Sequence, residues 1–309
     1  MTVRIGVVGL GATGGLFATH LAHQHEVHVI ARGARGAHAL TSGLHVTGHA
    51  EISAKLPPEQ VHLLDAPDAV PPSLGLDALL LCVKAHQVEP FVPMLEGLVS
   101  SSGVVVYLGN GLGVVERLAR AVPGHIAAAS STHGAMQGEG CTSIWTGLGE
   151  VAMAAWPGGA PQHAVESVAT CIEGAGLAVK RVSDARQQIW TKALLNIAIN
   201  PLCALAGVRN GEMLQTSLFD AGVGLLLEAE QVGRRDGVNL PDIDVLIGQM
   251  VDVLGATSEN RCSMLEDVRA GRPTEIDALN GFIVNLAEHH GMIATQNAQV
   301  TALIHALSQ

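Results

Sequence analysis

The chain has 309 residues, of which 48% are hydrophobic and only 15% are charged, a balance that supports a large core and argues against wholesale disorder. Its 28 acidic and 17 basic residues give a formal net charge of −11, and no lysine or arginine stripe is interleaved with aromatics, which argues against nucleic acid as a partner. A chain of this length is more typical of two domains than of one.

Cysteine, histidine and hydropathy patterns narrow the class further. The five cysteines form no CxxC pair, so we interpret them as small buried side chains in a reducing compartment, and the fifteen histidines form no HExxH motif, so no metal site is expected. The first residues run directly into an apolar strand without a signal-peptide pattern. The most apolar stretch, 193–207, is predicted to be too short and too polar to span a bilayer. We therefore expect a soluble cytoplasmic protein with no membrane partner.

From residue 3 to about residue 182, short β-rich runs alternate with helical segments, which is typical of a parallel sheet with crossover helices. The runs are continuously apolar, which favours strands buried on both faces. We expect a helix at 14–23, strands at 3–8, 27–31, 61–64, 78–83, 104–108 and 126–130, and later strands at 151–156 and 177–182 that form an antiparallel extension of the sheet.

The pattern becomes helical after about residue 183, with glycine and proline at the breaks. Helices are expected at 187–200, 218–236, 242–254 and 274–290. The sequence therefore predicts an α/β domain over residues 1–183 and a C-terminal all-α domain over residues 184–309.

A GxGxxG motif joins the first strand to the first helix, Gly9-Leu10-Gly11-Ala12-Thr13-Gly14. In this strand–turn–helix context the motif is typical of a dinucleotide site: Gly9 permits the tight turn, Gly11 leaves room for a pyrophosphate, and Gly14 lets the helix pack closely. The N–H groups at the start of the helix are suited to phosphate. The first domain is therefore predicted to have a Rossmann-type sheet that binds a dinucleotide cofactor.

The residue after the second strand distinguishes NAD from NADP sites. An NAD site places Asp or Glu there to hold the ribose 2′-hydroxyl, whereas this chain has Arg32, followed by Arg35. A guanidinium can bind a 2′-phosphate with two hydrogen bonds, so the sequence favours NADPH over NADH. The alternative is a solvated loop arginine, and this alternative has more weight for Arg35.

Polar residues follow two further strands. Lys84 comes directly after the strand at 78–83, and Asn110 lies between glycines after the strand at 104–108. Ligands of open α/β sheets bind outside the carboxyl ends of the strands, so Lys84 is a candidate contact for cofactor phosphate or ribose. Asn110 is either a site residue or simply a turn residue that tolerates left-handed geometry.

The helix expected at 187–200 is apolar nearly all round, yet Lys192, Asn196 and Asn200 recur every four residues and share one stripe. A lysine on a buried helix is unfavourable unless it is paired or lines a cavity. A narrow solvent-exposed face would carry Glu or Arg more readily than two asparagines. We therefore interpret this stripe as part of a site.

A second polar cluster spans 258–267 and 273–282. Residues 273–275, Pro-Thr-Glu, precede an apolar run and indicate a helix start, so Glu275 and Asp277 suit the positive end of a helix dipole. That explanation is sufficient for Glu275, whose role does not follow from spacing alone.

Over essentially its whole length the chain resembles the ketopantoate reductases (2-dehydropantoate 2-reductases). The resemblance is carried by the glycine loop, Lys84, Asn110 and a series of motifs: Ser131-Thr132-His133, Trp190-Thr191-Lys192, Asn196, Asn200-Pro201, Asn210-Gly211-Glu212, Ser263-Met264-Leu265 and Thr274-Glu275-Ile276-Asp277. The last two motifs, in this order, are much more specific than the glycine loop. Asn210 matches in motif only.

The resemblance implies a role for each matching residue. Lys192 and Glu275 match the family's catalytic pair. The NADPH contacts are matched by the glycine loop, Arg32, Lys84 and Asn110. The positions that contact substrate are matched by Asn110, Asn196, Asn200 and Ser263.

The residue types suit hydride transfer from NADPH to the C2 carbonyl of a 2-keto acid. Lys192 as an ammonium would polarise the carbonyl oxygen and donate a proton, and Glu275 would hold the ammonium or accept from a substrate hydroxyl. The asparagines offer donors and acceptors for a substrate hydroxyl, and Ser263 offers a donor for the carboxylate. We expect the ammonium to face the nicotinamide across the gap between the two domains.

Two alternatives remain open on the sequence. A related reductase could act on another small 2-keto acid, and Arg261, beside Ser263, has an undetermined effect on specificity. A non-enzymatic NADPH sensor would need the glycine loop and Arg32 but has no use for Lys192 and Glu275 together. A homodimer is compatible with the sequence, and so is a monomer.

Overall fold

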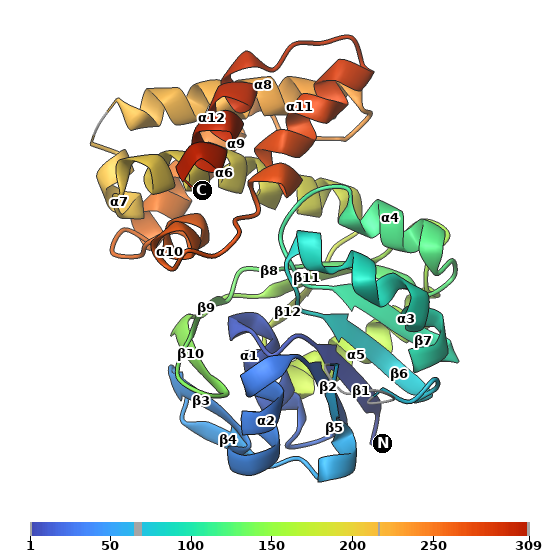
Figure 1. Ribbon diagram of the computed structural model, residues 1–309. Coiled ribbons are helices and arrows are strands. Elements are labelled where there is room, and N and C mark those ends of the chain that lie inside the picture. Colours follow the sequence, from blue (N-terminus) through green and yellow to red (C-terminus); the bar gives the residue numbers. More distant parts are fainter. Residues whose placement is uncertain (1, 65–69, 216, 308–309) are drawn as a thin grey trace. The chain divides into compact units, whose positions relative to one another are not determined.

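The computed structural model describes residues 2–64, 70–215 and 217–307 (Figure 1). The chain divides into two compact units. The first comprises Met1–Gly109 and Val114–Ala185, and the second comprises Asn110–Gly113 and Arg186–Gln309. The short segment 110–113 therefore belongs to the unit formed by the C-terminal half of the chain, although it is surrounded in sequence by the first unit.

An eight-stranded sheet organises the first unit, in the order β12-β11-β8-β7-β6-β1-β2-β5. From β5 to β8 the strands run parallel, β11 is antiparallel to β8, and β12 is parallel to β11. The expected parallel sheet with an antiparallel extension is thus confirmed. The strands are β1 Arg4–Val8, β2 Glu26–Ala31, β5 Val61–Leu63, β6 Leu76–Leu81, β7 Val99–Tyr107, β8 Ile126–Ser131, β11 Val151–Ala155 and β12 Val179–Arg181.

The strand order is the one that creates a ligand crevice. Counted from β1, the six parallel strands follow the 3-2-1-4-5-6 order of dinucleotide-binding folds, with the switch point between β1 and β6. The central strands are apolar on both faces: Val7 and Val8 in β1 and Leu80 in β6 are all 0% exposed. β7 begins five residues earlier than expected. The prediction missed this first part of the strand because Ser100 to Gly103 are not apolar.

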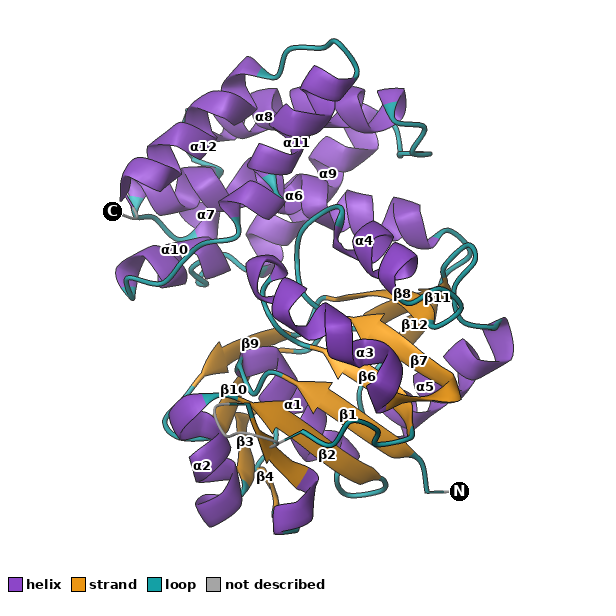
Figure 2. Ribbon diagram, turned by 45° about the vertical axis from the view of Figure 1, so that its right-hand side comes forward, coloured by secondary structure: helices purple, strands orange, loops and turns teal. Residues whose placement is uncertain are grey.

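Helices cover both faces of this sheet, with α1 and α5 on one face and α3 and α4 on the other (Figure 2). They are α1 Ala12–Leu21, α2 Gly33–Ser42, α3 Val92–Leu98, α4 Val114–Ala121 and α5 Gln162–Gly174, with short 3-10 turns η1 Pro58–Gln60, η2 Ala85–Gln87 and η3 Glu89–Phe91.

A small second sheet, which the sequence did not predict, packs against α1. Its order is β4-β3-β10-β9, with β3 Leu44–Gly48, β4 Ile52–Ala54, β9 Gly134–Gln137 and β10 Thr142–Gly147. The parallel pairing of β3 with β10 joins residues about a hundred positions apart, which local patterns do not reveal. Gly15 allows the close approach, since a Cβ there would lie 2.3 Å from Ser143 Oγ.

The second unit is helical, as expected (Figure 1). Its elements are α6 Ala185–Ala206, α7 Asn210–Met213, α8 Leu218–Arg235, α9 Ile243–Ala256, α10 Ser263–Arg269, η4 Ile276–Ala278, α11 Asn280–His289 and α12 Thr295–Leu307. One prediction is wrong: no continuous helix covers 274–290. Leu279 has φ −115° and ψ −99°, outside helical geometry, so the 3-10 turn η4 ends there and α11 begins at Asn280.

Helix α6 is the core helix of this unit. The apolar stretch at 193–207 largely lies within a longer helix of 22 residues, which by length and composition alone is long and apolar enough to cross a membrane. Most of it is nonetheless buried by protein: Trp190 is 1% exposed and Ile197 is 0% exposed. A single helix buried in this way is the pattern of a soluble core.

Candidate functional site

The glycine loop has the geometry that a pyrophosphate needs. Gly9 has φ +90°, and a Cβ on Gly14 would lie 1.8 Å from the carbonyl oxygen of Gly9, so neither position accepts another residue without distortion. A Cβ on Gly11 would instead meet no heavy atom within 4 Å. The open space at Gly11, at the start of α1, fits a ligand that approaches the backbone closely.

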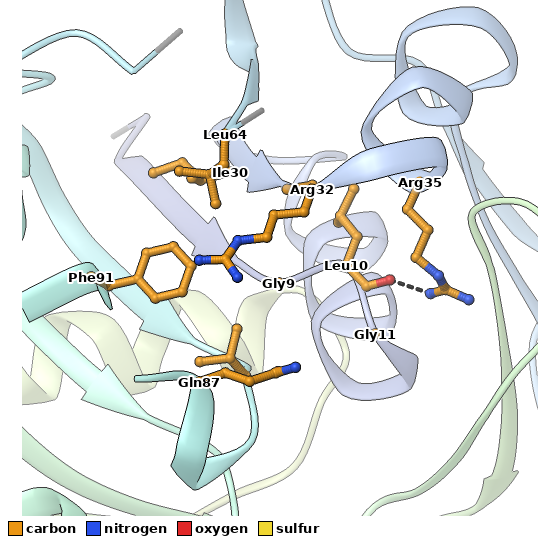
Figure 3. Close-up of a pocket in the computed structure, with 11 residues that line it drawn as sticks. Gly9, Leu10, Gly11, Ile30, Arg32, Arg35, Leu64, Gln87 and Phe91 are labelled. Carbon is orange, nitrogen blue, oxygen red and sulfur yellow. Dashed lines mark hydrogen bonds between the residues drawn. The ribbon is translucent and has the colours of Figure 1, made fainter. Parts of the chain in front are cut away.

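A pocket lies at the carboxyl ends of β1, β2, β5 and β6, where the strand order predicts ligand binding (Figure 3). Its wall combines the glycine loop with apolar side chains and two arginines. The lining residues are Gly9, Leu10, Gly11, Ile30, Ala31, Arg32, Arg35, Leu64, Val83, Gln87 and Phe91. Ala12, Thr13 and Gly14 form the first turn of α1 directly behind this loop.

The two arginines of the pocket have different surroundings (Figure 3). Arg32, the residue before α2, holds its guanidinium carbon 5.5 Å from the centroid of the Phe91 ring. Arg35 donates a hydrogen bond to the carbonyl oxygen of Leu10 in the glycine loop. Arg32 therefore extends toward Phe91 within the pocket, whereas Arg35 hydrogen-bonds the glycine loop. The contact of Arg32 with a cofactor ribose stays a prediction.

Lys84 lies three residues beyond the end of β6. It precedes the 3-10 turn η2, and its backbone N–H donates to Gln87 Oε1 at 3.4 Å. Gln87 lines the pocket, but Lys84 is not among the lining residues that the structure describes. A contact between Lys84 and the cofactor stays a prediction.

Three predicted site residues meet in the second unit. Lys192 Nζ donates to Asn110 Oδ1 at 2.8 Å, and Asn110 Nδ2 donates to Glu275 Oε2 at 3.1 Å. The asparagine thus bridges the ammonium and the carboxylate, and all three side chains are half-buried. Residue 110 is held in this unit because Leu112 N donates to the carbonyl oxygen of Ala278 at 2.8 Å, within η4.

Burial lowers the pKa of Lys192. Desolvation lowers the pKa of Lys192 to about 8, and the nearby Glu275 carboxylate opposes that shift. The side chain is therefore still mainly charged at pH 7, but its proton is held less firmly than that of an ordinary lysine. A perturbed lysine with a carboxylate partner is typical of a proton donor.

Asn196 and Asn200 follow Lys192 on the same stripe of α6. Asn196 is half-buried and Asn200 is 6% exposed. The carbonyl oxygen of Asn200 accepts a bond from Cys262 Sγ at 3.5 Å, and the same sulfur accepts from Leu265 N at 3.4 Å as the cap of α10. This contact brings Ser263, the exposed first residue of α10, to the end of the asparagine stripe.

Asn210 and Arg261 have structural partners. Asn210 Nδ2 donates to Thr257 Oγ1 at 2.8 Å, which ties α7 to the turn after α9. Arg261 lies 3.8 Å from Glu266 Oε1.

The sequence missed three residues that the structure brings to these sites. Phe91 and Gln87 line the pocket beside the glycine loop, and Asn280 donates to the carbonyl oxygen of Ile197 at 3.2 Å on α6. Their signals were weak: an aromatic after proline in a 3-10 turn, and one asparagine among several in a helical region. The five cysteines are free, and the described residues contain no group of three potential metal ligands.

Two family models together match most of the chain. Residues 5–158 match the family described as "Ketopantoate reductase PanE/ApbA", and residues 184–308 match "Ketopantoate reductase PanE/ApbA C terminal". The chain belongs to the ketopantoate reductase family. It is accordingly an oxidoreductase of a family whose members bind NAD(P)H.

Full-length relatives share both halves. The 2-dehydropantoate 2-reductase of Archaeoglobus fulgidus is 30% identical over 309 residues, covering 98% of this chain and 97% of the relative. The enzyme of the same name from Bacillus subtilis is 29% identical, covering 99% and 98%.

Solved structures agree in fold. A family ketopantoate reductase from Ralstonia eutropha superposes with a TM-score of 0.85 at 24% identity, covering 99% of this chain and 98% of that one. D-mandelate dehydrogenase in complex with NADH and anilino(oxo)acetate superposes with a TM-score of 0.88 at 23% identity, covering 99% and 98%. The shared fold therefore accommodates more than one substrate, so fold alone does not specify the keto acid of this ketopantoate reductase family member.

Proposed function

We propose that the protein reduces 2-dehydropantoate (ketopantoate) to pantoate with NADPH, a step in pantothenate and coenzyme A biosynthesis. The observation that carries the proposal is the hydrogen-bonded series of Lys192, Asn110 and Glu275, in which a desolvated ammonium is held by an amide that a carboxylate in turn holds. A protein that only sensed NADPH would have no use for this arrangement.

The cofactor part of the proposal rests on the first unit. Open space at Gly11 and the N–H groups at the start of α1 suit the pyrophosphate, and the Arg32 guanidinium suits a ribose 2′-phosphate. When bound, NADPH supplies the hydride that reduces the C2 carbonyl. No acidic residue stands in the first turn of α2, where a carboxylate would repel the 2′-phosphate.

Lys192 is proposed to supply the proton. The ammonium would stabilise the negative charge that develops on the carbonyl oxygen of the substrate and would transfer a proton to it from Nζ, leaving a neutral amine that solvent would reprotonate. A pKa near 8 suits this task, because the group is charged at neutral pH yet acidic enough to donate. Glu275, acting through Asn110, favours the charged form before transfer.

The substrate part rests on the stripe of α6 and the start of α10. Asn196 and Asn200 offer amide donors and acceptors for the 4-hydroxyl, and Ser263 offers a hydroxyl donor for the carboxylate. These substrate roles stay predictions. The same holds for three further points: a boundary between functional domains near 183, the approach of the nicotinamide to Lys192, and a homodimer.

The test is a keto acid panel. Ketopantoate, 2-ketoisovalerate and benzoylformate would each be assayed with NADPH and with NADH at equal concentration, and we expect the highest kcat/KM for ketopantoate with NADPH. Preference for another keto acid would make the protein a related reductase, and NADPH binding without turnover of any keto acid would make it a sensor.

Two lysine-to-alanine variants, one at the site and one at an exposed control position, test the catalytic role. We expect Lys192→Ala to lower kcat by about 10²–10⁴-fold with NADPH affinity retained. Lys180→Ala, at a side chain that is 58% exposed on β12, should leave kcat unchanged. Equal loss in both variants would contradict the proposed role of Lys192.

A further inference from the structure

The Arg32 guanidinium lies over the Phe91 ring at the wall of the cofactor pocket. The guanidinium carbon of Arg32 lies 5.5 Å from the centroid of the Phe91 ring, and the arginine side chain extends across the pocket toward that ring (Figure 3). The ring is 3% exposed, whereas Arg32 is an exposed side chain. A fixed aromatic surface therefore faces a long charged side chain that would otherwise sample many rotamers.

This pairing has a direct consequence for anion binding. An exposed arginine loses rotamer entropy when a phosphate fixes it. A ring that already holds the guanidinium reduces that loss, and the attraction between cation and ring adds to the effect. From this geometry we infer that Phe91 is a positioning residue that orients Arg32 for the 2′-phosphate, and so sets the preference for NADPH over NADH.

Neighbouring contacts separate this role from simple packing. The backbone of Phe91 is fixed independently of its ring, because Phe91 N donates to the carbonyl oxygen of Val88 at 2.9 Å in the turn η3. Arg35, the other arginine of the pocket, donates to the carbonyl oxygen of Leu10. Of the two arginines, Arg32 is the one whose guanidinium lies over the ring, so in this proposal the ring acts through Arg32 on the 2′-phosphate that NADH lacks.

The inference rests on the proposed NADPH chemistry, but it is tested without any keto acid. Binary affinities for NADPH and NADH would be measured by nicotinamide fluorescence, and 2′,5′-ADP would be titrated as a competitor that carries the 2′-phosphate alone. In Phe91→Leu we expect NADPH and 2′,5′-ADP to bind about two- to fivefold more weakly, the loss of one exposed cation–π contact, with NADH changed less. Phe91→Tyr keeps the ring and should keep the wild-type ratio of affinities.

A double-mutant cycle decides between positioning and structure. In the background of Arg32→Ala, Phe91→Leu should no longer change the ratio of NADPH to NADH affinity. The inference is overturned if Phe91→Leu weakens both cofactors by the same factor, or if it changes the ratio equally without Arg32. Phe91→Met replaces the leucine variant if thermal melting shows that leucine does not fold. If the cofactor affinities behave as expected but a separate assay shows no turnover of any keto acid, the result would count against the proposed reaction and not against this inference.

Discussion

Asn280 supplies the hydrogen bond that Pro201 cannot. Pro201 lies within α6 and has no N–H, so the carbonyl oxygen of Ile197, four residues earlier, lacks its helical donor. Asn280 Nδ2 donates to that same oxygen at 3.2 Å, and also to Asn297 Oδ1 at 3.0 Å, with its side chain wholly buried. The first residue of α11 is thereby tied to α6 between Asn196 and Asn200.

That tie has a consequence for the catalytic pair. Glu275 precedes Asn280 by five residues, across the turn η4. The hydrogen bond from Asn280 to Ile197 of α6 therefore limits where the Glu275 carboxylate can lie relative to Lys192, which is also on α6. A site built from two distant parts of the chain needs such a support, because small displacements of a proton donor lower activity strongly.

A double-mutant cycle tests the relationship. We expect Asn280→Leu to lower the free energy of unfolding by about 1–3 kcal/mol, because it leaves the buried carbonyl of Ile197 without a donor. Pro201→Ala restores an N–H at position 201, so the same asparagine substitution should be less damaging in that background. Chemical denaturation of the four proteins measures the coupling, and strict additivity of the two substitutions would contradict the compensation.

The pH dependence of turnover follows from Lys192. Because desolvation lowers its pKa to about 8, the ammonium is present at pH 7 and is lost as the pH rises through about 8, so kcat/KM should fall above that value. Glu275 raises the pKa, so Glu275→Gln should move the fall to lower pH. Profiles of kcat/KM from pH 6 to 10 check both points; an unchanged profile in Glu275→Gln would show that the carboxylate does not act on the ammonium.

The Cys262 sulfur links the cap of α10 to the asparagine stripe. It accepts from Leu265 N and donates to the carbonyl oxygen of Asn200, so Cys262→Ala should destabilise the protein by about 1 kcal/mol and raise the KM for the keto acid. Cys262→Ser keeps a capping atom that can make both bonds and should recover most of the loss. Thermal melting and steady-state kinetics measure the two effects, and equal behaviour of alanine and serine would rule out the capping role.

Short-range patterns explain how much of this architecture was predictable. Apolar runs marked β1, β2, β6 and β8 because strands buried on both faces need no alternation. The glycine loop, Arg32 and Lys192 were predicted from three local signals: a glycine motif between a strand and a helix, the position after the second strand, and a charge on an apolar helix.

Long-range pairings explain the rest. The sheet of β3 and β10 joins segments about a hundred residues apart, and the local sequence of neither strand predicts its pairing with the other. The bridge from Lys192 through Asn110 to Glu275 depends on the packing of segment 110–113 with the helical unit. The helix expected at 274–290 is divided because residues 276–278 form a 3-10 turn, which is frequent at α-helix ends, and Leu279 leaves helical geometry.

The buried His20 and the half-buried His133 predict an acid-sensitive fold in the first unit. Burial lowers the pKa of His20 and of His133, and the Nε2 atoms of both rings are buried without a hydrogen-bond partner among the described residues. Both rings contact Trp145, with centroids 5.2 and 5.5 Å from it. Protonation would place charge in this apolar cluster, so the folded state takes up protons less readily than the unfolded chain.

The sign follows from linkage. Because the folded pKa of each ring lies below the unfolded value of about 6.5, stability is at its full value above that pH and falls as the pH drops below it. Melting temperatures measured from pH 7.5 to 5 should therefore decline. His133→Asn keeps an acceptor for Gly149 N, which bonds the ring at 3.1 Å, but cannot be protonated, so it should flatten the decline, whereas the exposed His163→Gln should not. A decline of equal slope in both variants would mean that the His133 ring is not the group that titrates.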